Sequence, residues 1–391
     1  MRDAPRFGGW DRQGKALGKF VSRRQGIDRM ASLPKNHLAE CGWLKTGDVS
    51  NALVVSSRVR LARNIEDYPF SQWASSSDLK RIADEVKESI QSSPQLHELE
   101  LFDIEELESL DRHFLAERYM ISRELVKSGL ERYVAIHPRQ TASVMINEED
   151  HIRMQVLSAG SNLRQTWERI DSYDDELENR LSYSFSNSLG YLTACPTNVG
   201  TGIRCSVMIH LPALVMSRRI EKVLNAVTQM GLTVRGLSGE GSEIVGNLFQ
   251  VSNQWTLGIG EEETIDKIEK ILKHIIEQEQ KAESRMMEEK STSVEDKVWR
   301  AYAVLSQARV LSSNEAIELL SLIRLGRSLG ILERPSYESI NEAIIWMRPA
   351  HLQKSVGKSL SAGERDEVRA GQVREWIRNG GERRSAASLG G

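Results

Sequence analysis

The segment over residues 53–61 constrains the fold more than any other, because its apolar and polar side chains alternate with a period of two. Such alternation is typical of a β-strand that buries one face. One face would carry Val55, Ser57, Val59 and Leu61, and the other Val54, Ser56, Arg58 and Arg60. The predicted strand therefore presents two arginines side by side on the face opposite its apolar residues.

Other short strands are predicted at residues 143–146, 204–209 and 233–236, and at 248–252 and 255–259, which Asn253 and Gln254 would join as a tight hairpin. Residues 78–128 are charged and amphipathic and are predicted to be helical. A helix over 264–278 would bear one apolar stripe, formed by Ile265, Ile268, Ile271, Leu272 and Ile275. Strands and helices do not alternate regularly, so we expect an α+β fold with a mainly antiparallel sheet flanked by helices.

The last hundred or so residues carry no strand pattern. A charged run over 279–290 leads into two sequences typical of capping boxes, one starting at Ser312 and the other at Ser361. Pro349 is expected to close the helix that contains Ile340, Ile344 and Ile345. We therefore predict a basic disordered arm over 1–29, a catalytic domain over 30–285 and an all-helical domain over 286–391.

Composition excludes several classes of protein. The 391 residues have a net charge of −3 and 6 % aromatic side chains, so a nucleic-acid-binding role is not expected. The three cysteines form no C-x-x-C pair, which speaks against a disulfide framework and a structural zinc site and favours a reducing, cytoplasmic location. No apolar stretch approaches the roughly 20 residues of a membrane span, and no resident metal site is expected.

The familiar nucleotide-binding and hydrolase motifs are absent. Gly357-Lys358-Ser359 resembles the end of a P-loop, but Leu352 stands where the first glycine belongs. The protein-kinase signatures, the G-x-S-x-G elbow and the H-E-x-x-H motif are also missing. A phosphate-binding site would have to be built in another way.

Five arginines offer such a site: Arg58, Arg60, Arg153, Arg204 and Arg235. Each alone is typical of a surface or strand edge. Together they occur beside an acidic run at 148–150 and a glycine-rich loop at 195–202. Because arginine binds phosphate bidentately and neutralises the charge of a transferring phosphoryl group, the five form a candidate triphosphate clamp.

The same segments resemble those of the ATP:guanidino phosphotransferases, the phosphagen kinase family. The motifs are S-S-R-V-R at 56–60, N-E-E-D-H at 147–151, C-P-T-N-V-G-T-G-I-R at 195–204 and R-G-x-x-G-E at 235–240, in the family's order. The resemblance implies ATP with Mg²⁺, Glu149 as the catalytic carboxylate, Glu240 as a second one, and Cys195 beside the guanidinium. It implies a nucleotide site of Ser56, Ser57, Arg58, Val59, Arg60, His113, Arg153, Arg204, Cys205, Ser206, Val207, Met208, Arg235, Gly236, Leu237, Ser238, Gly239 and Glu240.

The chemistry of guanidinium phosphorylation explains why carboxylates are needed, independently of the family resemblance. A guanidinium has a pKa above about 12 and is a poor nucleophile while protonated, so its phosphorylation needs carboxylates that orient it and accept a proton. Each of these residues also has a purely structural interpretation. Residues 148–150 could form a solvated acidic turn, Cys195 could be a small buried residue, and His113 could be a surface residue of a helix.

Two departures from the small-molecule kinases of the family point to one branch. Only 55 residues precede Ser56, whereas those kinases resemble one another in carrying a helical domain there. The late run R-D-x-x-R-A at 365–370 and this short front resemble the bacterial protein-arginine kinases. That resemblance implies arginine side chains of proteins as substrates, an activator protein, a Clp-type unfoldase and protease as partners, and a phosphoarginine receptor at Arg365, Asp366 and Arg369. Apolar residues of the C-terminal helices lead us to expect a homodimer.

Alternative functions remain at this point. Within enzymes, the chain could be a kinase of free arginine or a related small guanidine. In another class, it could be a non-catalytic phosphoarginine reader or a DNA-associated regulator that uses its basic arm. The pair Glu149 and Glu240 speaks against the reader, and the net charge of −3 speaks against the regulator. The R-D-x-x-R-A run could, instead of binding phosphoarginine, simply form an exposed helix with salt bridges.

Deletion of residues 1–29 is predicted to leave folding and activity intact. The segment holds eight Lys and Arg against three Asp and has no apolar face to pack, and Met30 is a plausible start. The thermal midpoint and the turnover of the truncated chain, each compared with the full chain, check this prediction. A large drop in the midpoint would show that the arm is structural.

Overall fold

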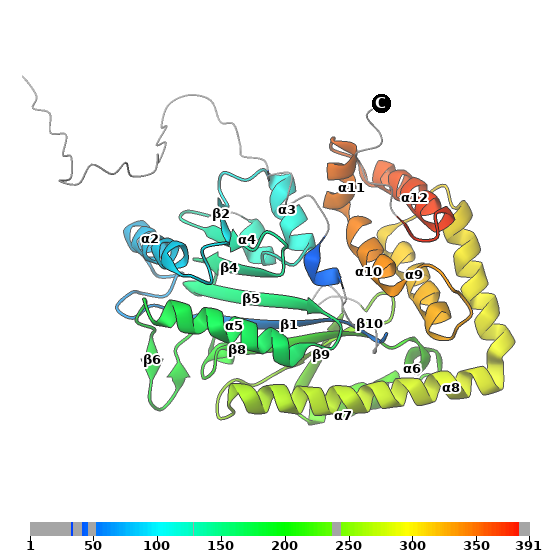
Figure 1. The fold of residues 1–391 in the computed structure, drawn as a ribbon, viewed down its shortest axis with the longest axis horizontal. Helices are drawn as coiled ribbons and strands as arrows, with labels where there is room; N and C mark the ends of the chain where they lie inside the picture. Colours follow the sequence, from blue (N-terminus) through cyan, green and yellow to red (C-terminus); the bar gives the residue numbers. More distant parts are fainter. Residues whose placement is uncertain (1–32, 34–40, 46–51, 128, 237–243, 383–391) are drawn as a thin grey trace, which may run out of the picture. The chain divides into compact units, whose positions relative to one another are not determined.

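The computed structural model describes residues 33, 41–45, 52–127, 129–236 and 244–382, and its centre is an eight-stranded sheet (Figure 1). The strand order is β2-β3-β4-β5-β1-β8-β10-β9, and every neighbouring pair is antiparallel. The strands are β1 (Val54–Arg63), β2 (Glu100–Asp103), β3 (Tyr133–Ile136), β4 (Ala142–Ile146), β5 (Ile152–Ala159), β8 (Ile203–His210), β9 (Leu232–Gly236) and β10 (Leu248–Asn253). The predicted α+β fold with an antiparallel sheet is confirmed.

Helices and short turns connect and cover these strands. They are η1 (Gly42–Leu44), α2 (Ser76–Ser92), α3 (Ser109–Glu117), α4 (Arg123–Val126), α5 (Leu163–Glu178), η2 (Pro196–Asn198), α6 (Pro212–Met216), α7 (Ile220–Gln229), α8 (Glu261–Gln307), α9 (Ser313–Ser328), α10 (Tyr337–Trp346), α11 (Pro349–Val356) and α12 (Ala362–Arg378). A separate two-stranded hairpin pairs β6 (Phe185–Ser186) with β7 (Gly190–Tyr191). From residue 286 onward the described residues contain helices and no strand, as predicted.

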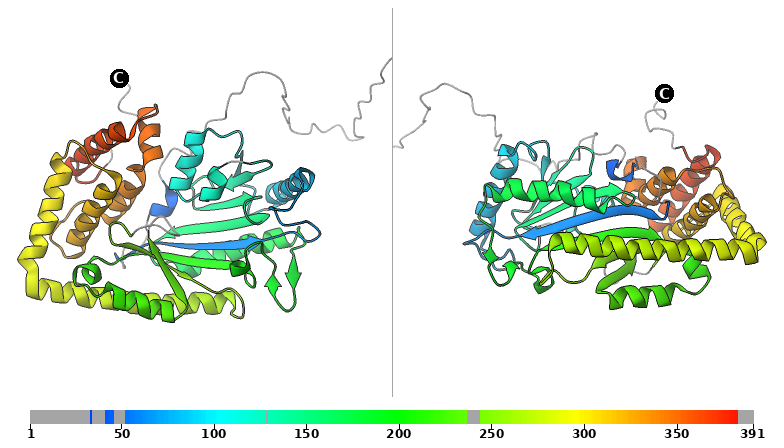
Figure 2. Two further views of the ribbon diagram at one scale, coloured as in Figure 1. Left: turned by 180° about the vertical axis from the view of Figure 1, so that it is seen from behind. Right: turned by 60° about the horizontal axis from the view of Figure 1, so that its bottom comes forward.

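One face of the sheet is buried under α5 and the first half of α8 (Figure 2). Val59 and Leu61 of β1 belong to this core together with Trp167 of α5 and Ile268 of α8. The long helix α8 bends at Lys290, which has non-helical backbone angles. Its second half joins α9, α10 and α12 in another core, which also takes in Met208 and Leu248 from one end of the sheet.

Helix α8 is longer than the sequence suggested. The helix predicted over 264–278 continues through the charged run at 279–290, because Glu279, Ala282 and Met286 extend the buried stripe. Glu279 is buried and accepts hydrogen bonds from the backbone N–H groups of Ala213 (2.6 Å) and Leu214 (3.0 Å) at the start of α6. Burial raises the pKa of Glu279 to about 8. The predicted domain boundary at 285–286 falls inside this helix.

Three other local predictions were wrong. Residues 100–103 form strand β2 within a segment predicted to be helical throughout. Residues 255–259 form no strand, and β10 pairs instead with β8 and β9. A register shift between Val54 and Ser56 exchanges the faces of Val54 and Val55, so Val54 joins the core under α5 and Val55 joins the core of the C-terminal helices.

The predicted helix ends are found. Ser312 and Ser361 are the N-caps of α9 and α12, and Ser361 forms a full capping box with Glu364. Helix α10 ends before Pro349, which opens α11. No helix of the described residues is long and apolar enough to cross a membrane. The predicted arm, residues 1–29, lies outside the described residues.

A buried ion pair fixes the end of β1 next to the glycine-rich loop. Arg63, 1 % exposed, donates from Nε and Nη2 to Asp174 Oδ2 of α5, over 3.0 and 2.5 Å. Its Nη1 donates to the carbonyl of Thr201 (2.9 Å), and its guanidinium lies 3.6 Å from the centroid of the Tyr191 ring. The pair therefore ties α5, β1 and the loop before β8 together.

Asp174→Asn is expected to lower the free energy of unfolding by about 3–5 kcal/mol, because it leaves the buried Arg63 charge without its counter-charge. Asp175→Asn, an exposed position on the same helix, is the matched control and should change stability little. Urea denaturation of both variants measures the difference. Equal stabilities for the two variants would contradict the structural role of the pair.

Candidate active site

The five predicted phosphate-binding arginines lie on one face of the sheet, opposite α5 and α8. Residues directly paired across antiparallel strands share a face. Arg204 of β8 is paired with Arg60 of β1, and Arg153 of β5 is paired with Ala62, two residues further along β1. Arg235 of β9 reaches the same face through its pairing with Gln250 and the pairing of Gln250 with Met208. We call this surface the arginine face.

The arginine face gathers buried positive charges that repel one another. Burial and the nearby guanidinium groups of Arg153 and Arg204 lower the pKa of Arg58 to about 10, and burial with the same neighbours lowers the pKa of Arg60. The Nε of Arg60 is buried and has no hydrogen-bond partner among the described residues. Because arginine stays charged in proteins, such a cluster calls for a multiply charged anion.

Glu149 lies in the loop between β4 and β5, at the edge of the arginine face. Its neighbour Glu148 is buried and binds Arg153 (2.7 Å), whereas the Glu149 side chain is 44 % exposed and lies 3.9 Å from the same arginine. Burial raises the pKa of Glu148, but Arg153 and the hydrogen bonds it accepts bring the pKa below its ordinary value. Burial raises the pKa of Glu149 above its ordinary value. The charge of Arg153 acts to lower this pKa, whereas the charges of Asp150 and Glu148 raise it further.

The Glu149 loop is held in place by its neighbours. Asn147 has a positive φ of 54°, and its amide Nδ2 donates to the carbonyls of Leu79 and Glu131, both over 2.8 Å. Asp150 is fully buried, and its Oδ1 accepts from Asn64 Nδ2 (2.8 Å) and from the backbone N–H of Ala194 (2.7 Å). Because Ala194 precedes Cys195, the Asp150 bond joins the Glu149 loop to the Cys195 loop.

The Cys195 loop reaches the arginine face through two constrained glycines. Gly200 has a φ of 113°, and a Cβ there would lie 2.2 Å from the Thr256 carbonyl; Gly202 has a φ of 65°, and a Cβ there would lie 2.6 Å from the Ala62 carbonyl. Only glycine fits such positions without a shift of the backbone. The partly buried Cys195 Sγ lies 3.0 Å from Thr197 Oγ1. The loop therefore places Cys195 at one of its ends, and Arg204 follows its other end, at the start of β8.

Several predicted residues do not present side chains to this surface. Ser56, Ser206 and Met208 share the arginine face, but Ser57, Val59, Cys205 and Val207 point into the core on the other side. Gly236 is paired with Phe249, which also lies on the core side. Leu237, Ser238, Gly239 and Glu240 lie outside the described residues. For the core-facing residues, any nucleotide contact would be made by main-chain atoms.

His113 is an exposed residue of α3, and its Nδ1 lies 2.8 Å from the Ser109 carbonyl of the same helix. Helix α3 packs on the arginine-face side of the sheet, where Phe114 and Leu115 contact Met145 and Leu157. The helix therefore lies beside the arginine face, and the nucleotide-binding role of His113 stays a prediction.

Of the three residues predicted to bind phosphoarginine on α12, Arg369 is buried. Arg369 is 1 % exposed and donates to the carbonyls of Met347 (3.0 Å) and Leu311 (2.7 Å) and to Asp366 (2.5 Å). Arg365 donates to the Leu360 carbonyl (2.9 Å). Asp366 retains 29 % side-chain exposure, so a ligand would meet Arg365 and Asp366 while Arg369 holds the aspartate.

Sequence reasoning missed two kinds of residue at this site. Asn64 and Asp150 position the Glu149 and Cys195 loops, although Asp150 belongs to a motif that was recognised. Tyr119, which follows α3, places its ring centroid 5.7 Å from the Arg58 guanidinium. Nothing in the local pattern marks Tyr119, because its contact is with a residue 61 positions away along the chain.

Comparisons with known proteins agree with this geometry. Residues 81–282 match the model of the ATP:guanido phosphotransferase C-terminal catalytic domain, and residues 291–388 match the protein-arginine kinase McsB C-terminal domain. The chain is 42 % identical over 339 residues to the protein-arginine kinase of Symbiobacterium thermophilum, covering 86 % of this chain and 96 % of that one. It is 43 % identical over 338 residues to that of Moorella thermoacetica, covering 86 % and 97 %.

The fold of this chain is similar to those of solved structures. The duplicated taurocyamine kinase of Schistosoma mansoni with transition-state-analogue components matches with a TM-score of 0.55 and 22 % identity, over 84 % of this chain and 50 % of that one. A lombricine kinase matches with a TM-score of 0.54 and 24 % identity, over 59 % and 67 %. The likeness in fold, the matched catalytic domain and the relatives at over 40 % identity agree with one another: the chain is a kinase that belongs to the ATP:guanido phosphotransferase family.

Proposed function

We propose that this kinase transfers the γ-phosphoryl group of ATP to the guanidinium of arginine side chains in proteins. The observation that carries the proposal is the convergence of an arginine face, the Glu149 loop and the Cys195 loop at one place. The C-terminal helices match the domain of protein-arginine kinases, and the relatives at about 40 % identity bear that name, which favours protein substrates over free arginine.

The arginine face would hold the triphosphate. Forked guanidinium groups bind phosphate oxygens bidentately, and the buried Nε of Arg60 would gain an acceptor. Charge that develops on the transferring group would be stabilised by side chains that are already in place, without reorganisation during the reaction. Arg153 bridges the two parts of the site, because it lies on the arginine face and pairs with Glu148 beside Glu149.

In the proposed reaction a terminal nitrogen of the substrate guanidinium attacks the γ-phosphorus of ATP. The bond between that phosphorus and the β–γ bridging oxygen breaks, and ADP leaves with the electron pair. Glu149 orients the guanidinium and accepts the proton that the attacking nitrogen loses. Its raised pKa makes it a stronger base than an ordinary glutamate, and Glu240 is proposed as the second orienting carboxylate.

Mg²⁺ fits this site as a companion of the nucleotide. The described residues contain no group of three His, Cys, Asp or Glu side chains that could hold an ion by themselves. In kinases Mg²⁺ is bound largely by substrate phosphates and water, and it neutralises phosphate charge.

Regulation and partners extend the proposal. A phosphoarginine receptor at Arg365 and Asp366, an activator protein, delivery of marked proteins to a Clp-type protease, a homodimer and a cytoplasmic location stay predictions. Exposed apolar residues on the second half of α8 and just beyond it, among them Trp299 (52 %) and Val310 (59 %), support an association between copies.

Incubation with Mg-ATP and casein, followed by a test for acid-labile arginine-linked phosphate, checks the proposed activity. Free arginine at an equal concentration of guanidinium groups is the competing substrate. Phosphate on casein arginines and little turnover with free arginine are expected. Preferential phosphorylation of free arginine would favour the alternative function as a small-guanidine kinase.

Glu149→Gln is expected to lower kcat at least about a hundredfold and to change the affinity for ATP little, because the amide cannot accept the proton. In the wild type, turnover should fall as the pH drops through the raised pKa of Glu149, above the ordinary value of 4.5. Steady-state kinetics and calorimetric ATP titration separate the two effects. An equal loss of ATP affinity would place Glu149 in the phosphate site instead.

Arg204→Ala is expected to reduce the rate about 10³-fold, in the range of arginines that stabilise phosphoryl transfer. Arg204→Lys should recover only part of this loss, since a point charge lacks the two-pronged geometry of the guanidinium. The same pattern is expected at Arg235. Arg219→Ala, near the start of α7, is a control outside the arginine face. Wild-type kinetics in Arg204→Lys would contradict the clamp.

A further inference from the structure

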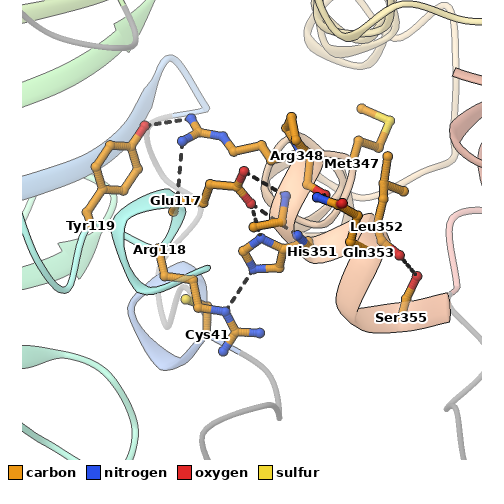
Figure 3. Close-up of polar contacts among 12 residues, drawn as sticks. Cys41, Glu117, Arg118, Tyr119, Met347, Arg348, His351, Leu352, Gln353 and Ser355 are labelled. Atoms are coloured by element: carbon orange, nitrogen blue, oxygen red, sulfur yellow. Dashed lines mark hydrogen bonds and ion pairs between the residues drawn. The ribbon is translucent and has the colours of Figure 1, made fainter. Parts of the chain in front are cut away.

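Three consecutive residues at the end of α3 join the catalytic sheet to the C-terminal helices (Figure 3). The carboxylate of Glu117 accepts hydrogen bonds from the backbone N–H groups of Ala350 (2.9 Å) and His351 (3.1 Å), which are free donors in the first turn of α11. The ring of His351 also donates from Nδ1 to Glu117 (2.7 Å) and accepts from Arg118 Nε (2.9 Å). Glu117 and Arg118 thus anchor α11.

The third residue, Tyr119, lies between two guanidinium groups. Arg348, the N-cap residue of α11, donates from Nη2 to the Tyr119 hydroxyl over 2.8 Å, and its guanidinium lies 5.1 Å from the ring centroid. The Arg58 guanidinium lies 5.7 Å from the same centroid. Arg58 belongs to the arginine face, whereas Arg348 belongs to the C-terminal helices, so one aromatic ring contacts both regions.

Tyr119 is held from the sheet side as well. Its backbone has a φ of 63°, a left-handed conformation that residues with a side chain rarely adopt. Its carbonyl accepts from the amide of Gln155 (2.5 Å), which is paired with Arg60 on the arginine face. The ring of Trp43 meets Tyr119 edge-on, with 5.8 Å between centroids. The ring therefore has a defined place relative to the phosphate-binding strands.

Arg58 needs such a support. Its guanidinium is repelled by Arg153 and Arg204, and its Nε is held by the Ser206 hydroxyl at 3.4 Å, a long hydrogen bond. A positive charge over an aromatic face is attracted by the ring's electrons. Tyr119 can thus oppose the repulsion that would turn Arg58 out of the site, without neutralising the charge that a phosphate requires.

We propose that Tyr119 is a positioning residue for Arg58, and that Arg348 keeps Tyr119 in place, so that the seating of α11 controls how Arg58 meets the nucleotide. The proposal rests on the proposed function, because it takes Arg58 as a phosphate-binding residue. Arg348 is itself fixed from two sides. Its Nη1 donates to the Glu117 carbonyl (3.2 Å), and the preceding carbonyl, that of Met347, accepts from Arg369 of α12 (3.0 Å).

The test compares Tyr119→Leu, Tyr119→Phe, Arg348→Ala and the double variant Tyr119→Phe/Arg348→Ala in the full chain. The KM for ATP, kcat and the thermal midpoint are measured for each. Tyr133→Phe is the matched control: this tyrosine also carries a cation over its ring, Lys87 at 4.2 Å, and a hydroxyl bond to Glu131, but it lies on β3, away from the arginines. Arg58→Ala tests the underlying phosphate role.

Tyr119→Leu is expected to raise the KM for ATP about tenfold, in the range of a partly desolvated cation–π contact. Tyr119→Phe and Arg348→Ala should each raise it about threefold, and the double variant no further than either single one, because both remove the same contact. Tyr133→Phe should leave the KM unchanged. This KM shift would not result from a merely structural role, which lowers the midpoint and the active fraction only.

An unchanged KM for ATP in folded Tyr119→Leu would overturn the proposal, and so would additive effects of Tyr119→Phe and Arg348→Ala. A lower thermal midpoint with an unchanged KM would leave Tyr119 a purely structural residue and would also overturn it. If Arg58→Ala leaves both KM and kcat unchanged, the phosphate role of Arg58 fails, which is a failure of the proposed function rather than of the Tyr119 contact.

Discussion

Repulsion among the guanidinium groups of Arg58, Arg60, Arg153 and Arg204 is the interaction on which the rest of the site depends. These charges share one face of the sheet, and Arg153 forms a close ion pair there with Glu148. A flexible surface would let such charges turn apart into water. Here the antiparallel strands set their spacing, and the core beneath α5 and α8 keeps those strands rigid. The site is thereby organised for a polyanion before one binds.

The Glu149 loop and the Cys195 loop are held by polar contacts that converge on the same strands. Asn64, directly after β1, bonds Asp150, and Asp150 bonds the residue before Cys195. Arg63, one residue earlier, bonds Asp174 and the carbonyl of Thr201. The end of a single strand thus positions the acidic loop, the cysteine loop and, through them, the place where a guanidinium would meet the phosphates. Buried charge is tolerated at this point because each group has a defined partner.

The sequence predicted the strands and motifs that depend on local pattern. Alternation in β1 placed Arg58 and Arg60 on one face correctly, but it could not show that Arg153 and Arg235 share that face, because this depends on pairing between distant strands. It misplaced Val54 and Val55, since a bulge has no signature in the alternation. Strand β2 and the continuation of α8 through its charged run depend on tertiary packing. Tyr119 could not be found, because its contacts with Arg58 and Arg348 join residues that are distant in the sequence.

Calorimetric titration with ATP and with AMP, each at low and at high salt, tests most directly whether the arginine face is a triphosphate clamp. The account predicts that ATP binds about a hundredfold more tightly than AMP, because the β- and γ-phosphates engage several charge-assisted contacts. It also predicts that salt weakens ATP binding more than AMP binding. Equal affinities for the two nucleotides, with equal dependence on salt, would contradict it.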